Sequence, residues 1–212
     1  MDLPQTSNAI PRSDIDPFSD AFLTDPYRDH ERMRSLGPVF FLERYGVHAM
    51  ARHAEVSAAL TDWQTYSSAR GVGIQDFAKE PPWRPKSILL EADPPLHDRT
   101  RKIQARVLSP GAMRALREPF KAKAAALADA LVAKRRFDAV PDLAEAFPLS
   151  VFPDAVGIRE DGREQLLPFS TMVFNSFGPQ NERFKQSLRD AEKVVAWINE
   201  QCKRESLAPG RL

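Results

Sequence analysis

The sequence predicts a mainly α-helical fold with one small β-hairpin near its start, which is an α+β arrangement. Beyond Pro95 most segments combine strong helix formers with apolar residues at helical spacing. Two short apolar runs, Val39–Leu42 and Val47–Ala51, flank a turn near Gly46, which is typical of a hairpin. The chain of 212 residues is long enough for a sizeable core and predicts one domain or two.

The N-terminal region is expected to begin with a flexible lead-in over residues 1–20, since proline, serine and aspartate dominate it. A helix over residues 24–37 should follow. Asp25 is placed to cap it, Pro26 suits its first position, and Gly37 should end it.

A short amphipathic helix is expected after the hairpin, over residues 52–62, with Val56, Ala59 and Leu60 on one side. Between residues 65 and 95 the apolar residues follow neither a helical nor a strand period, and glycine, proline and serine are frequent. Long irregular segments in a compact domain are uncommon and often functional.

Helices dominate the remainder of the chain. The longest is expected to be interrupted near Pro119, and the last two should be joined at Gly178–Pro179. The predicted helical ranges are 96–108, 112–136, 140–157, 161–178 and 181–206.

Composition excludes several classes of function. The 30 basic and 29 acidic residues give a net charge of +1, so no global attraction to nucleic acid or an anionic membrane is expected. The single cysteine, Cys202, excludes an internal disulfide and a metal site built on several thiolates. No apolar run is long enough to span a membrane, and the start lacks the pattern of a secretory signal, so we expect a cytoplasmic protein.

The predicted helix over residues 96–108 has three distinct faces. His97 and Arg101 lie one turn apart and can both donate charge-assisted hydrogen bonds to a carboxylate or phosphate, although an ordinary charged surface helix has the same spacing. An apolar stripe should face a core, and a third side is basic. The stripe is Leu96, Ile103 and Val107, and the basic side is Arg99, Lys102 and Arg106.

The stretch "EADPPLHDRTRKIQARVLSP" resembles the C-helix region of bacterial cytochromes P450, the haem-thiolate monooxygenases. The shared pattern is Asp-Pro-Pro-x-His-x-x-x-Arg followed by Ser-Pro. The segments "DPFSDAFLTDPY", "LAEAFPLSVFPDAVG" and "FNSFGP" resemble the same family in order, so the resemblance covers nearly the whole chain. It implies a haem cofactor whose propionates are bound by His97 and Arg101.

Three further segments, "RGVGIQDF", "PWRPKSILLEADPP" and "VFNSFGPQNE", resemble the bacterial cytochromes P450 that oxidise para-substituted benzoates, including O-demethylation of 4-methoxybenzoate. The resemblance implies that Arg84 and Ser87 hold the substrate carboxylate, which suits a guanidinium and a hydroxyl. It further implies that Phe174 and Phe177 pack on the aromatic ring, and that Leu90 makes an apolar contact. From the residues alone, Arg84 is equally an exposed loop charge, and the phenylalanines are more often core.

The sequence departs from the family where the iron should be held. The motif Phe-x-x-Gly-x-x-x-Cys-x-Gly is absent, and Cys202 lacks its flanking residues. The central helix with its acid–alcohol pair and the Glu-x-x-Arg helix are absent too. We therefore expect residues 21–212 to be the N-terminal part of a cytochrome P450, spanning its A to G helices. No catalytic or metal-binding residue is predicted, and the chain alone is expected to be inactive.

Two alternatives remain open from sequence. One is a non-catalytic α-helical module that binds an aromatic acid or a protein, and the other is a truncated gene remnant. Under the enzyme hypothesis, the family implies a para-substituted benzoate as substrate, with ferredoxin and ferredoxin reductase as partners. Arg99, Lys102 and Arg106 then belong to the surface where an acidic ferredoxin docks, or are simply a solvated face.

Overall fold

The structure, a computed structural model, describes residues 9–208. These residues form two compact units, each of which is described by itself. The first unit contains the residues up to His97 together with Phe177–Pro179. The second contains Asp98–Ser176 and the residues from Gln180 on.

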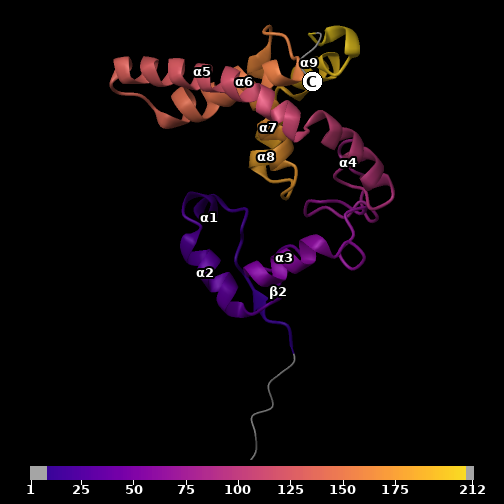
Figure 1. The fold of residues 1–212 in the computed structure, drawn as a ribbon. Coiled ribbons are helices and arrows are strands. Elements are labelled where there is room, and N and C mark those ends of the chain that lie inside the picture. Colours follow the sequence, from indigo (N-terminus) through magenta and orange to yellow (C-terminus); the bar gives the residue numbers. More distant parts are fainter. Residues whose placement is uncertain (1–8, 209–212) are drawn as a thin grey trace, which may run out of the picture. The chain divides into compact units, whose positions relative to one another are not determined.

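The first unit contains a three-stranded sheet, whose middle strand is labelled in Figure 1. Its strands are β1 (Arg12–Ser13), β2 (Phe40–Leu42) and β3 (Val47–Ala49), in the order β1-β2-β3. The β2–β3 pair is antiparallel, with Gly46 at a positive φ of 63° in its turn, so the predicted hairpin is confirmed. The parallel pairing of β1 with β2 was not predicted.

The hydrophobic core of the first unit shows that the lead-in was predicted too long. Ile15 is buried together with Phe22, Met33, Phe40 and Leu42. A strand at residues 12–13 and a buried Ile15 place this segment in the folded structure. The polar and proline residues around Ile15 led to the prediction of a flexible segment, although Ile15 packs into the core beside the sheet. Residues 1–8 of the predicted lead-in lie outside the described residues.

The first unit also contains three helices among its described residues: α1 (Asp20–Thr24), α2 (Tyr27–Leu36) and α3 (His53–Thr61). The predictions for α2 and α3 are confirmed, but α1 was missed, because it is only five residues long. Asp25 ends α1 instead of capping α2, and Pro26 takes the cap position of α2 without a side-chain bond. The expected apolar side of α3 is not buried, since Leu60 is 81% exposed.

The chain from Asp62 to Pro95 contains no helix or strand, as the loss of period predicts. Helix α4 (Leu96–Val107) follows, close to its predicted bounds. The peptide bond between Pro94 and Pro95 is cis.

The second unit is helical, and the positions of most helices agree with the prediction. Helix α6 packs against α5, while α7 packs against both α8 and α9. Buried side chains, including Leu131, Val151, Met172 and Val194, lie within this unit. In chain order its helices after α4 are α5 (Pro110–Lys134), a π-helical turn η1 (Val140–Glu145), α6 (Ala146–Val156), a 3-10 turn η2 (Arg163–Gln165), α7 (Leu166–Asn175), α8 (Glu182–Ser187), α9 (Ala191–Gln201) and a 3-10 turn η3 (Arg204–Ser206).

Two helix predictions were wrong. Helix α5 runs through Pro119 without interruption, because one lost backbone hydrogen bond is offset by a capped start at Ser109 and an alanine-rich second half. The expected single helix over residues 181–206 is divided into α8 and α9. The amides of Leu188 and Arg189 bond to carbonyls three residues back, which closes a turn and ends α8.

The fold class is confirmed as mainly helical with a small sheet. Within residues 9–208, none of the helices combines the length and apolarity needed to cross a bilayer.

Candidate functional site

Asp93 joins the two ends of the irregular segment between α3 and α4 by hydrogen bonds to its carboxylate. The Ser67 hydroxyl donates to Asp93 Oδ2 at 2.5 Å, and the Ser68 amide donates to Oδ1 at 3.0 Å. The carbonyl oxygen of Asp93 accepts from the His97 amide at 3.1 Å at the start of α4. Both carboxylate oxygens of Asp93 therefore hold the loop next to the start of this helix.

Further contacts order the same loop from within. Arg70 forms a two-point ion pair with Asp76, and the Phe77 amide donates to the Arg70 carbonyl at 2.8 Å. Lys86 Nζ donates to the Ala69 carbonyl at 3.2 Å and lies 5.6 Å from the Phe77 ring centre. The loop lacks regular structure, but its polar groups are bonded to one another.

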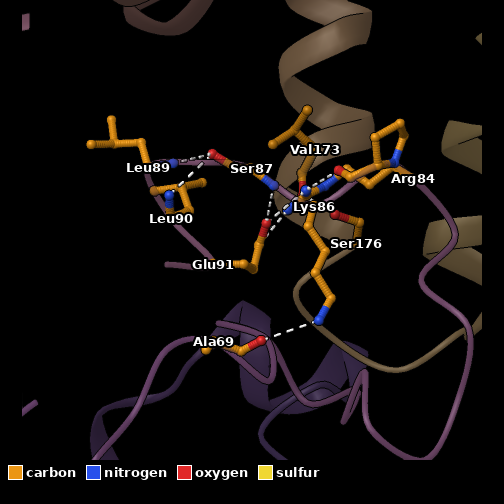
Figure 2. Close-up of polar contacts among 10 residues, drawn as sticks. Ala69, Arg84, Lys86, Ser87, Leu89, Leu90, Glu91, Val173 and Ser176 are labelled. Atoms are coloured by element: carbon orange, nitrogen blue, oxygen red, sulfur yellow. Dashed lines mark hydrogen bonds and ion pairs between the residues drawn. The ribbon is translucent and has the colours of Figure 1, made fainter. Parts of the chain in front are cut away.

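The centre of the loop is a buried ion pair between Arg84 and Glu91 (Figure 2). Arg84 Nη1 donates to Glu91 Oε2 at 3.0 Å, and Nη2 donates to Oε1 at 2.7 Å. Nη1 also donates to the Pro85 carbonyl at 3.0 Å. The Glu91 side chain is 0% exposed and that of Arg84 is 20% exposed. Arg84 is therefore held in one orientation and is not a freely solvated loop charge.

Ser87 belongs to the same cluster. Its amide donates to Glu91 Oε2 at 2.6 Å, while the Glu91 amide donates to the Ser87 carbonyl at 3.0 Å. The Ser87 hydroxyl oxygen accepts from the amides of Leu89 at 3.2 Å and Leu90 at 3.0 Å (Figure 2). A hydroxyl that accepts twice keeps its own proton for donation, so it can still bond to a carboxylate.

Glu91 stays ionised in this cluster. Burial acts to raise the pKa of its carboxyl, but hydrogen bonds from Arg84 and from the Ser87 amide, with the charges of Arg84 and Lys86, outweigh burial and lower that pKa below the ordinary value. Arg84 and Lys86 are cations and Glu91 is an anion. This cluster therefore carries a net charge of +1 beside Ser87.

Phe177 is tied to this loop by its backbone. The Ile74 amide donates to the Phe177 carbonyl at 2.9 Å, and a Cβ on Gly73 would lie only 2.7 Å from that oxygen. The close approach requires glycine at position 73. A glycine in an irregular segment can signal such a close approach of two backbones.

The predicted substrate residues are divided between the units. Arg84, Ser87, Leu90 and Phe177 lie in the first unit, whereas Phe174 lies in the second. Helix α7 ends at Asn175, so the two phenylalanines do not share a helix face as their spacing predicts. Phe174 is 72% exposed and Leu90 is 46% exposed, so neither is a core residue of the described chain. No sequence pattern singles out Glu91.

His97 and Arg101 both lie on α4, four positions apart. Arg101 is exposed and its Nη1 donates to Gln104 Oε1 at 2.5 Å. The predicted apolar stripe of this helix is not buried, since Leu96 is 49% exposed and Ile103 is 61% exposed. The spacing identifies a face suited to burial, but within residues 9–208 it stays largely exposed at Ile103 and only partly covered at Leu96 and Val107.

These residues fit a haem only in part. An imidazole and a guanidinium one turn apart suit the two propionate groups. The thiolate position does not fit, because Cys202 is exposed at the end of α9 among charged residues. In the part of the chain that the structure describes, no group of three or more His, Cys, Asp or Glu side chains is arranged to hold a metal ion. No chemical step through iron is therefore derived from this chain.

Several known proteins are similar to this chain in sequence. It is 49% identical over 207 residues to cytochrome P450 CYP199A2 of Rhodopseudomonas palustris, covering 97% of this chain and 50% of that protein. It is 27% identical over 198 residues to nocardicin C N-oxygenase of Nocardia uniformis, covering 89% of this chain and 48% of that protein. The chain thus spans about half the length of these relatives. No protein-family model matches it.

Solved structures with the same fold are also cytochromes P450. P450BioI in complex with an acyl carrier protein matches with a TM-score of 0.67 at 18% identity, over 91% of this chain and 52% of that chain. CYP109Q5 from Chondromyces apiculatus matches with a TM-score of 0.61 at 20% identity, over 91% of this chain and 48% of that chain. At this identity the likeness is one of fold.

Proposed function

This chain belongs to the cytochrome P450 family, and we propose from that premise that it supplies the substrate-binding loop and the propionate-binding helix of a monooxygenase that acts on para-substituted benzoates. The aromatic acid is the substrate, and the reaction inserts one oxygen atom, as in hydroxylation or O-demethylation. The chain by itself lacks a fitting iron ligand and is expected to be inactive.

The contact that joins Phe177 to the loop of Arg84 carries this proposal. This bond runs from the Ile74 amide to the Phe177 carbonyl, and Phe177 and Arg84 belong to the same compact unit. A benzoate needs these two kinds of contact, since an anionic head requires a cation and an aromatic ring favours an aromatic neighbour. Ser87, bonded to the same buried Glu91, adds a hydroxyl donor.

The haem, when bound, supplies the oxygen-activating chemistry of the family. The contribution of this chain is to hold the cofactor's edge through His97 and Arg101 on α4. The same helix exposes Arg99, Lys102 and Arg106, which supports docking of an acidic ferredoxin there. An ordinary solvated face has the same composition, so the binding of an acidic ferredoxin to the full chain, measured at rising salt, distinguishes the two. Docking through these charges weakens as salt screens them.

The substrate proposal is tested by calorimetric titration of the full chain with 4-methoxybenzoate and with its methyl ester, which lacks the negative charge. Arg84→Gln should weaken acid binding at least about tenfold and leave ester binding unchanged, because a charge-assisted bond is lost. Arg70→Gln is the matched control, since it removes an exposed arginine of the same loop. Equal losses in both variants, or none in Arg84→Gln, would contradict the proposal.

A second candidate is an aromatic-acid-binding module without catalysis. It is favoured by one observation: the first unit has its own hydrophobic core and holds Arg84, Ser87 and Phe177 together. Such a module binds 4-methoxybenzoate with the same affinity whether or not haem is added. The enzyme proposal expects tighter binding when haem is present, because the cofactor forms part of the pocket.

A further inference from the structure

The guanidinium of Arg84 has two edges that can bind a carboxylate, and the protein occupies only one of them. Nη1 and Nη2 form the end edge, and both donate to Glu91. The outer proton of Nη1 is directed to the Pro85 carbonyl. Among the described residues nothing accepts from Nε, and Nη2 has a second proton beyond the one that Glu91 accepts. Nε and Nη2 together form the second edge.

We propose that Glu91 is a positioning residue for substrate: its carboxylate fixes Arg84 by the end edge so that the Nε–Nη2 edge is presented to the carboxylate of an aromatic acid. This inference rests on the proposed function. Glu91 suits the task because its side chain is fully buried and is also bonded by the Ser87 amide at 2.6 Å. Because these contacts hold Glu91, its carboxylate cannot move together with the Arg84 side chain.

The arrangement lowers the entropy cost of binding. A free arginine side chain loses rotamer freedom when it is immobilised, and this loss opposes binding. Here Glu91 has already immobilised it on folding, so the incoming carboxylate meets an ordered donor pair. The charge of Glu91 opposes the substrate's charge, but Lys86 lies close enough to lower the pKa of Glu91, and the cluster of Arg84, Lys86 and Glu91 stays positive by one.

A purely electrostatic role for Glu91 predicts the opposite result from a positioning role. If Glu91 only weakens the positive charge of Arg84, then Glu91→Gln removes a repulsive charge and 4-methoxybenzoate binds more tightly. If Glu91 positions Arg84, the same substitution turns an acceptor into an amide donor that faces Nη1 or Nη2. The guanidinium is then released and the acid binds more weakly.

The test measures the dissociation constants of 4-methoxybenzoate and its methyl ester for the full chain by calorimetry. Glu91→Gln should weaken acid binding about tenfold and leave ester binding within about twofold. Glu91→Asp keeps the charge but withdraws the carboxylate by one methylene, and should weaken acid binding in the same direction. Asp76→Asn is the matched control, since it breaks the other arginine–carboxylate pair of the loop and should change neither constant.

Each other outcome overturns the inference in a distinct way. Unchanged or tighter acid binding in Glu91→Gln, with the wild type still preferring the acid, leaves the proposed function intact and removes the positioning role. Loss of both ligands in both Glu91 variants shows that Glu91 holds the loop's fold and does not orient Arg84. A wild-type chain that does not prefer acid over ester contradicts the proposed function, and this inference with it.

Discussion

Ser87 illustrates how single side chains replace regular structure in the loop between α3 and α4. Its hydroxyl oxygen accepts from two consecutive amides, Leu89 and Leu90, which would otherwise lack a partner in a tight turn. Asp93 does the same at the loop's base with Ser67 and Ser68. Short polar side chains compete well for nearby backbone groups, so a segment rich in them can be ordered without a helix or strand.

Ser87→Ala should therefore lower the free energy of unfolding by about 1 kcal/mol, because two backbone donors lose their acceptor. Urea denaturation measures this change. Ser35→Ala is the control: the Ser35 hydroxyl only donates back to the Glu31 carbonyl within α2, and alanine favours a helix. A loss in Ser35→Ala as large as that in Ser87→Ala would contradict the assigned role.

Tyr45 provides a second test at the residue scale. Burial, followed by its hydrogen bond to Asp16 Oδ1 at 2.5 Å, raises the pKa of the Tyr45 hydroxyl to about 12 from 10.0. Asp16→Asn should move that pKa down toward 10, since the charged acceptor is removed. Absorbance titration of phenolate measures it, with Tyr45→Phe identifying the signal among the three tyrosines.

The sign of the linked stability follows from that raised pKa. A group whose folded pKa exceeds its unfolded value stabilises the protein fully below the unfolded pKa, and the stabilisation is lost as pH rises through the folded pKa. The contribution of Tyr45 should thus be present below about pH 10 and lost toward pH 12. Unfolding stability of Tyr45→Phe that tracks the wild type over this range would contradict the assignment.

Helices of the second unit are joined by one carboxylate, that of Asp154 on α6. It accepts from Lys123 Nζ on α5 at 2.6 Å and from Arg163 Nη2 of η2 at 2.7 Å. Lys123 also donates to the Ser150 carbonyl at 2.6 Å. Hydrogen bonds from Lys123 and Arg163 lower the pKa of Asp154 below the ordinary 3.8. Three elements are thus held by charges that the sequence spacing does not reveal.

Asp154→Asn should lower the free energy of unfolding by about 2 kcal/mol near neutral pH, as two charge-assisted bonds are weakened. Because the folded pKa of Asp154 is depressed, its contribution is present above 3.8 and lost as pH falls through the lower folded pKa. The stability difference between wild type and variant should therefore shrink below pH 3.8, as denaturation curves across pH would show. A difference that stays constant below that pH counts against this role.

Element boundaries were predicted best where the pattern was strong. The hairpin around Gly46 and helix α4 match expectation because turn chemistry and apolar spacing are local signals. The break between α8 and α9 was missed, since three backbone turns near Leu188 leave the apolar period unchanged. At Pro119 a helix break was predicted but is absent, because a helix that is well capped and alanine-rich tolerates one lost hydrogen bond.

At the scale of the whole molecule, the prediction to be tested is that this chain does not bind haem through a cysteine thiolate. The full chain, supplied with haem, reduced and exposed to carbon monoxide, should show no thiolate-type Soret band, since Cys202 is exposed and lacks the family motif. Cys202→Ser is the control and should give the same spectrum as the wild type. A thiolate band that disappears in Cys202→Ser would overturn this prediction.

The sequence by itself determined the family, the helical fold class, the hairpin and the identity of the candidate residues Arg84, Ser87, His97 and Arg101, because motifs and periodicity are properties of neighbours along the chain. Only the tertiary structure decided how Arg84 is used. The end edge of its guanidinium is occupied by Glu91, and the Phe177 backbone meets Gly73 across more than a hundred positions. Such contacts join distant or unpatterned residues, and the hydrogen bonds of a buried polar group depend on what surrounds it in space.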